Sequence, residues 1–162
     1  MTPSTHHAAT DAPRPDAPDP DSLDAEVLAL LRAAFHAARS GDALQLQELL
    51  GRGVPADIRN EKGESLLLLA SYHGHSEAVR LLLARGADPE LPSDRGQTAL
   101  QGAAFKGHVA VAELLLDAGA AVDGNNGDGK TPLLYATMFG RSELERLLLS
   151  RGAQREAGSH SA

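Results

Sequence analysis

A repeat of 33 residues constrains this chain more than any other feature of its 162 residues. Residues 61–93 recur in register as 94–126 and 127–159, so glycines, hydroxyl side chains and leucine triplets align. The aligned positions are Gly63, Gly96 and Gly129; Ser65, Thr98 and Thr131; Gly74, Gly107 and Gly140; the triplets 81–83, 114–116 and 147–149; and Gly86, Gly119 and Gly152, each followed by alanine. This period is typical of an architecture in which each unit packs only against its neighbours.

Each repeat carries the signals for two short helices. The hydroxyl column that begins with Ser65 can accept hydrogen bonds from the free N–H groups of a first helical turn, and Pro132 follows Thr131 at a position that tolerates proline. About nine residues later, the column of Gly74 can supply the left-handed backbone that ends a helix. A second helix then runs through the leucine triplet and ends at the column of Gly86. These signals predict an all-α stack of helix-turn-helix units.

These residues resemble the ankyrin repeat. The motifs that carry the resemblance are Thr-Pro-Leu-x-x-Ala at 131–136, Gly-His at 74–75 and 107–108, Gly-Ala-Asp at 86–88 and Arg-Gly-Ala at 151–153. The resemblance implies an ankyrin-repeat solenoid over residues 23–158, with hairpin-like loops and about three full repeats after an N-terminal capping repeat. It also implies a protein-interaction module rather than an enzyme.

Two details depart from a regular repeat. Leu68, Gln101 and Leu134 stand where the resembled family often has histidine, and we expect a structural hydrogen bond between repeats to be lost there. Gly102 and Tyr135 are equivalent positions on consecutive inner helices. We expect Gly102 to leave the space that Tyr135 fills from the next repeat.

The first 22 residues differ in composition from the rest. They hold five of the nine prolines and few apolar side chains, which predicts a disordered Pro/Asp-rich tail. His6-His7 lies in this tail, and we interpret the pair as solvated polar residues rather than metal ligands.

A degenerate first repeat follows the tail. Apolar residues at helical spacing over 23–38 end before Gly41, which lies one period before Gly74. Asp21 or Ser22 is the expected helix cap, and residues 23–60 are expected to form the capping repeat. The last repeat is the less obvious cap, because its leucines predict a partly apolar outer face. A homodimer through the C-terminal repeat is therefore an alternative to the expected monomer, and a structural homo-oligomer built through the end repeats is an alternative function.

Charge and composition exclude several classes of partner. The net charge of -7 argues against nucleic acid and anionic membranes, and no stretch has the length of a membrane span or the pattern of a secretory signal. The chain has no cysteine. The default expectation is a cytoplasmic protein.

One motif suggests a different function. Residues 124–131 match the G-x-x-x-x-G-K-[ST] phosphate loop, which makes nucleotide binding the main alternative. A phosphate loop needs a preceding buried strand, and residues 117–123 leave no room for one, whereas the repeat register explains Gly129 and Thr131. The calcium-like run 123–128 and the pair His73 and His75 are weaker still. We predict no catalytic residue, no cofactor and no metal.

The binding surface follows from the resemblance. In an ankyrin-like stack, the loop before each inner helix and the last exposed residues of that helix form a concave groove. The protein-binding residues predicted on this basis are Tyr72, His73, Arg95, Gln97, Phe105, Lys106, Met138 and Phe139. Rigid rings bury much area at low entropic cost, so Tyr72, Phe105 and Phe139 are the expected anchors. The alternative is that Tyr72 and Phe105 pack against adjacent repeats and complete the core. The sequence does not identify the protein or peptide partner.

Overall fold

The computed structural model describes residues 20–125 and 127–155, with side chains from residue 24 onward. The predicted tail up to residue 19, including His6-His7, lies outside the described residues. The helices of the described part are α2 (Pro20–Ser40), α3 (Ala43–Gly51), α4 (Leu66–Tyr72), α5 (Ser76–Ala84), α6 (Ala99–Lys106), α7 (Val109–Asp117), α8 (Pro132–Met138) and α9 (Ser142–Ser150).

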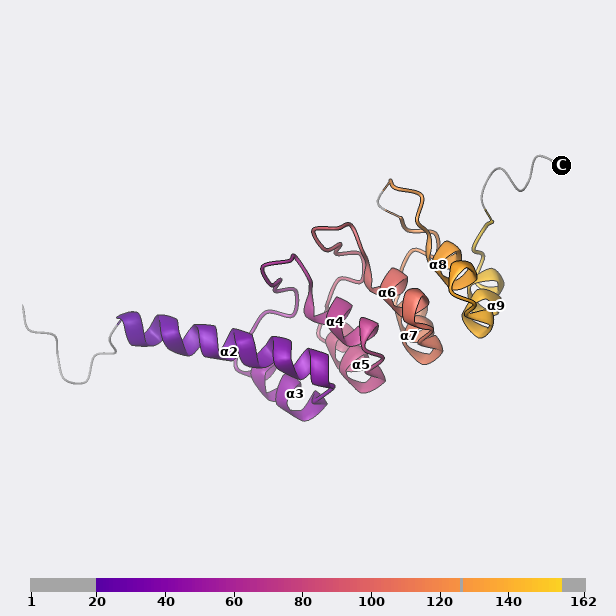
Figure 1. The fold of residues 1–162 in the computed structure, drawn as a ribbon. Helices are drawn as coiled ribbons and strands as arrows, with labels where there is room; N and C mark the ends of the chain where they lie inside the picture. Colours follow the sequence, from indigo (N-terminus) through magenta and orange to yellow (C-terminus); the bar gives the residue numbers. More distant parts are fainter. Residues whose placement is uncertain (1–19, 126, 156–162) are drawn as a thin grey trace, which may run out of the picture.

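The helices form antiparallel pairs that lie side by side in a row (Figure 1). The inner helices α2, α4, α6 and α8 pack in sequence against one another, and so do the outer helices α3, α5, α7 and α9. The loops before α4, α6 and α8 project to one side of the row, and we call them the finger loops (Figure 1). Within the described residues, β pairing is limited to one isolated bridge between Arg59 and Ser65. The predicted all-α solenoid is confirmed.

Helix α2 starts earlier than the sequence suggested. It begins at Pro20, so Asp21 and Ser22 lie inside the helix and the expectation that one of them caps it is wrong. Proline is tolerated in the first helical turn because the N–H that it lacks has no intrahelical partner there. The resulting helix of 21 residues is far longer than the other inner helices and extends beyond them (Figure 1).

The predicted starts of the inner helices are confirmed. Ser65 Oγ accepts a hydrogen bond from the backbone N–H of Leu68 at 3.0 Å, and Thr131 Oγ1 accepts one from Leu134 at 3.1 Å. Thr98 does the same for Gln101, whose side chain in turn accepts from the Thr98 N–H at 2.8 Å. This reciprocal pair is a capping box.

The position of Gly74, at the end of α4, requires glycine for two reasons. Gly74 has a φ of +77°, and a Cβ there would stand 2.7 Å from the ring of His108 in the next repeat. The predicted left-handed position is therefore also a point of close contact between repeats. The His108 ring uses this space to place Nε2 3.0 Å from the Tyr72 carbonyl oxygen, just as His75 Nε2 reaches the Arg39 carbonyl at 2.7 Å.

Gln101 corrects the expectation about the missing histidines. Its side-chain Nε2 donates to the carbonyl oxygen of Lys130 at 2.6 Å and to that of Gly124 at 3.4 Å, and both belong to the finger loop before α8. The inter-repeat hydrogen bond is therefore kept at Gln101. At the equivalent positions, Leu68 is buried and Leu134 is half-buried.

The packing around Gly102 also differs from the prediction. The atoms closest to a Cβ built at Gly102 belong to Leu68 and Tyr72 of the preceding repeat, at 3.5 and 3.6 Å. The Tyr135 ring instead lies edge-on to Phe105, with 6.2 Å between centroids. The expectation that Tyr135 fills this space is wrong, because this side of the inner helix faces the preceding repeat.

Candidate protein-binding groove

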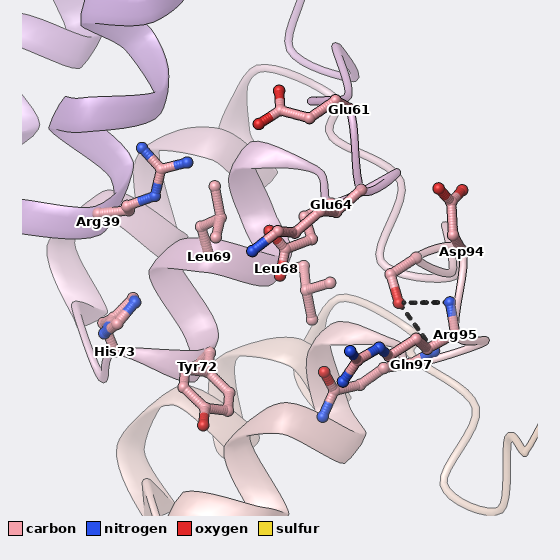
Figure 2. Close-up of a pocket in the computed structure, with 12 residues that line it drawn as sticks. Arg39, Glu61, Glu64, Leu68, Leu69, Tyr72, His73, Asp94, Arg95 and Gln97 are labelled. Atoms are coloured by element: carbon pink, nitrogen blue, oxygen red, sulfur yellow. Dashed lines mark hydrogen bonds between the residues drawn. The ribbon is translucent and has the colours of Figure 1, made fainter.

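The finger loops and the inner helices enclose two cavities on the concave side of the stack. The first has a volume of about 550 Å³ and lies beside α4, with an apolar floor and a charged rim (Figure 2). The residues that line it are Arg39, Glu61, Lys62, Glu64, Leu68, Leu69, Tyr72, His73, Ser93, Asp94, Arg95 and Gln97. Ser93 Oγ accepts hydrogen bonds from the N–H groups of Arg95 and Gln97, both at 3.3 Å, which fixes this part of the rim (Figure 2).

The second cavity lies one repeat further along the stack. It has a volume of about 320 Å³ and shares Tyr72, Arg95 and Gln97 with the first. The residues that line it are Tyr72, Arg95, Gly96, Gln97, Gln101, Phe105, Asp128, Lys130 and Tyr135. The shared residues make the two cavities neighbouring parts of one groove.

Three rings form an aromatic strip along this groove: Tyr72, Phe105 and Phe139. Tyr72 and Phe105 stack with 6.1 Å between centroids, and Phe105 meets Phe139 at 4.6 Å with the rings inclined by 70°. Phe139 is 43% exposed and the adjacent Met138 is 64% exposed, while Tyr72 and Phe105 are half-buried. The rings pack on one another across repeats, as the packing interpretation expects, and each keeps some exposed surface. Their role as binding anchors stays a prediction.

A basic row runs beside the aromatic strip and consists of Arg39, His73 and Lys106. All three are exposed and lie within one residue of the C-terminal end of α2, α4 or α6. The Lys106 ammonium nitrogen lies 5.2 Å from the centroid of the Tyr72 ring, a cation–π contact. Desolvation, followed by the charges of His75, Lys106 and Arg39, lowers the pKa of His73, so the positive charge of the row near pH 7 comes from Arg39 and Lys106.

The structure brings the predicted binding residues to the same side of the stack. Tyr72, His73, Arg95 and Gln97 line the first cavity, and Phe105 joins the lining of the second. Three others, Lys106, Met138 and Phe139, are exposed at the ends of α6 and α8 but are outside both linings. Their role as binding residues stays a prediction.

Sequence reasoning missed several lining residues, among them Arg39, Gln101 and Tyr135. A signal existed for Arg39, because it lies one period before Tyr72 and therefore belongs to the column that includes Phe105 and Met138. Gln101 and Tyr135 sit within helices, and Gln101 is buried with its side chain hydrogen-bonded to the finger loop before α8, so the repeat pattern gives no signal that they line a cavity.

The phosphate-loop match does not have the structure that phosphate binding requires. A phosphate loop offers its free N–H groups to the anion. Here Asn125 Oδ1 accepts from the N–H of Gly127 at 2.7 Å, and Asp128 Oδ1 accepts from that of Lys130 at 2.9 Å. Thr131 uses its hydroxyl to cap α8. Residue 126 lies outside the described residues, and the geometry of the others gives no support to the nucleotide alternative.

The described part of the chain offers no metal site and no membrane span. No group of three or more histidine or carboxylate side chains there is placed to hold a metal ion. None of the helices in the same residues combines the length and the apolar character needed to cross a bilayer.

The comparisons with known proteins agree on the type of repeat. The sequence matches the family described as ankyrin repeats (3 copies), over residues 34–126 and again over 85–158. It is 51% identical over 72 residues to an ankyrin repeat protein of Pseudomonas aeruginosa, which is 44% of this chain and 39% of the relative. It is 46% identical over 52 residues to ankyrin repeat domain-containing protein 29 of Homo sapiens, which is 32% of this chain and 17% of that protein. The matched region thus spans less than half of either relative.

Proposed function

The chain belongs to the ankyrin-repeat family, and we propose that it binds a segment of another protein in its concave groove without catalysing a reaction. Ankyrin repeats are generally protein-interaction modules. The observation that carries the proposal is the aromatic strip, which remains accessible beside two cavities in a stack whose other aligned apolar side chains are largely buried.

The strip has the properties of a binding anchor. Aromatic side chains are enriched among the few interface residues that dominate affinity, because they bury much apolar area with only two side-chain torsions to order. Met138 lies next to Phe139 and adds a flexible apolar contact. The mixed charges around the cavities suit the alignment of a partner more than long-range attraction.

A cross-linked pull-down from native lysate tests the proposal. The bait is either the wild-type chain or a variant with Tyr72→Ala, Phe105→Ala and Phe139→Ala. We expect the wild type to retain a protein that the variant loses, because the variant lacks the strip. Thermal unfolding must first show that the variant is folded.

Exposed apolar residues elsewhere provide a matched control. Val27, Leu28 and Leu44 are exposed on α2 and α3 and line neither cavity. Their replacement by alanine also removes three apolar side chains and should retain the captured protein. If the strip variant captures the same proteins as the wild type, the groove is not the binding site. The cytoplasmic location stays a prediction from the sequence.

A further inference from the structure

We infer that the segment bound in the groove carries an acidic side chain close to an apolar or aromatic one, with its carboxylate against the basic row and its apolar neighbour on the aromatic strip. The inference rests on the proposed function and adds the chemistry of the partner. It is based on three observations. The basic row follows the groove, no carboxylate of the described residues forms an ion pair with the row, and Lys106 contacts the aromatic strip.

The basic row occupies one edge of the groove. Arg39, His73 and Tyr72 lie on the same side of the first cavity, and Asp94 and Arg95 lie on the other (Figure 2). Since Arg39, His73 and Lys106 come from three successive inner helices, the row follows the long axis of the groove. A linear segment bound along the groove would meet all three residues.

No carboxylate within the described residues forms an ion pair with this row. The ion pairs found there join Arg80 to Glu77, Arg151 to Asp117 and Arg155 to Glu145. The carboxylate that acts on His73 belongs to Glu64, and it accepts a hydrogen bond from Asn60 at 2.9 Å. Asp42, at the end of α2, instead caps α3 by accepting from the N–H of Gln45 at 3.1 Å. Arg39 and Lys106 are thus available to an external carboxylate.

The opposite edge has a different character. The charged finger-loop residues that line the two cavities are acidic and basic in nearly equal number, namely Glu61, Glu64, Asp94 and Asp128 with Lys62, Arg95 and Lys130. A nucleic acid would bring its continuous negative charge against these carboxylates, which opposes binding. A short protein segment with one or two acidic residues avoids this repulsion. The observations therefore favour a peptide over a polyanion.

The row and the strip are joined at one point. Lys106 extends over the Tyr72 ring and follows Phe105 directly in sequence, so a carboxylate on Lys106 has apolar surface beside it. Neighbouring helices in such a stack are about 8–10 Å apart, which an extended chain spans in about three residues. The acidic and apolar residues of the partner should therefore lie within about three positions of each other.

A display library of random twelve-residue peptides tests this inference on the full chain. Peptides selected on the wild type should be enriched in Asp or Glu within three positions of Phe, Tyr, Trp or Leu. An Arg39→Glu, Lys106→Glu variant should bind the selected peptides at least about tenfold more weakly, because charge reversal places like charges together. If that variant does not fold, Arg39→Gln with Lys106→Gln removes the same two positive charges without adding negative ones.

The chain offers a matched control for the charge change. Arg52 and Arg85 are exposed at the C-terminal ends of the outer helices α3 and α5 and line neither cavity. An Arg52→Glu, Arg85→Glu variant changes the net charge equally and should bind the selected peptides like the wild type. Equal weakening in both variants would overturn the inference, because the effect would then come from net charge alone.

The remaining outcomes separate the inference from the proposed function. Selected peptides that are basic or uncharged, yet lost with Phe105→Ala, would leave groove binding intact and overturn the acidic partner. Selected peptides that ignore Tyr72→Ala, Phe105→Ala and Phe139→Ala together would overturn the proposed function itself. Displacement of an acidic peptide by a single-stranded oligonucleotide would overturn the inference in favour of a nucleic acid.

Discussion

The two ends of the stack cover their outermost repeats in different ways. At the N-terminal end, the long helix α2 replaces a regular inner helix and leaves Val27 and Leu28 half-exposed, while Leu44 on α3 is 81% exposed. At the C-terminal end, the helices keep the length of the internal repeats, and single polar residues stand at positions that are buried further inside.

The repeat register identifies these polar substitutions. Thr137 is exposed at the position of the buried Ala104, and Glu145 stands where Ala112 is buried. The Glu145 carboxylate also forms an ion pair with Arg155 at 3.0 Å. An end of a stack can thus be made compatible with water by changing few residues in an ordinary repeat. This finding weakens the prediction of an apolar dimer face at the C-terminal repeat, which otherwise stays untested.

The largest effect should distinguish the middle of the stack from its C-terminal end. Leu115 and Leu148 are equivalent and fully buried, but Leu115 has a repeat on both sides. Leu115→Ala should cost about 2–5 kcal/mol, because it leaves a cavity that neighbours on both sides cannot fill. Leu148→Ala should cost less, since the last repeat can unfold separately. Denaturant unfolding of both variants measures the difference, and equal costs would show that the stack unfolds as one unit.

The polar residues of the C-terminal end offer the next test. Thr137→Ala with Glu145→Val gives the outer face the small and apolar residues of an internal repeat. The stability of the monomer should change by about 1 kcal/mol or less, because the ion pair that is lost is still partly exposed, with 50% of the Arg155 side chain and 28% of the Glu145 side chain accessible. The variant should associate as concentration rises, which light scattering would detect. A variant that stays monomeric at the concentrations tested would mean that these residues do not prevent stacking.

A smaller effect is expected at the same column inside the stack. Ala38, Ser71, Ala104 and Thr137 are equivalent, and Ser71 Oγ is buried without a hydrogen-bond partner. Ser71→Ala should therefore stabilise the protein by about 1 kcal/mol, since it removes an unsatisfied hydroxyl and improves helix propensity. Thr137→Ala, at the exposed end, provides the control and should change the melting temperature less. A destabilised Ser71→Ala variant would show that the hydroxyl has a partner such as a water molecule.

Much of this architecture could be predicted because the repeat places the same signal at equivalent positions. The caps at Ser65 and Thr98 and the left-handed glycine at Gly74 are local features, and each is found as expected. The positions of Tyr72 and Phe105 on the concave side also follow from the register.

The features that could not be predicted depend on contacts between repeats. Gln101 reaches the carbonyl of Lys130, 29 residues away, and its reach depends on the path of a loop that the periodic pattern does not specify. The neighbour of Gly102 was predicted wrongly because periodicity does not reveal which adjacent repeat each side of a helix faces. The sequence also could not decide between packing and binding for the strip rings, since Tyr72 and Phe105 are half-buried and stack on each other across repeats.

The smallest expected effect concerns how stability depends on pH through the side-chain hydrogen bonds that connect neighbouring repeats. We call these contacts the joints. His75, His108 and Arg141 are equivalent, and each side chain lies within hydrogen-bond distance of a carbonyl of the preceding repeat. Arg141 Nε donates to Phe105 O at 3.1 Å, so the joint nearest the C-terminal end has no group that titrates near neutral pH. Desolvation is the main cause that lowers the pKa of His108 from its ordinary value of 6.5. The hydrogen bond with the Tyr72 carbonyl opposes this shift, and the charges of Lys106, His75 and Arg141 lower the pKa further.

The sign of the pH effect follows from this lowered pKa. As pH falls below about 6.5, the unfolded chain binds a proton at His108 before the folded chain does, so the free energy of unfolding decreases. The melting temperature should therefore be lower at pH 5.5 than at pH 7.5. His108→Arg copies the residue of the C-terminal joint, keeps a donor for the Tyr72 carbonyl and removes the titration, so its melting temperature should vary less with pH. If the melting temperature of that variant varies with pH as much as that of the wild type, other groups control the pH dependence. The histidine at the internal contact and the arginine at the C-terminal contact would then have the same effect on it.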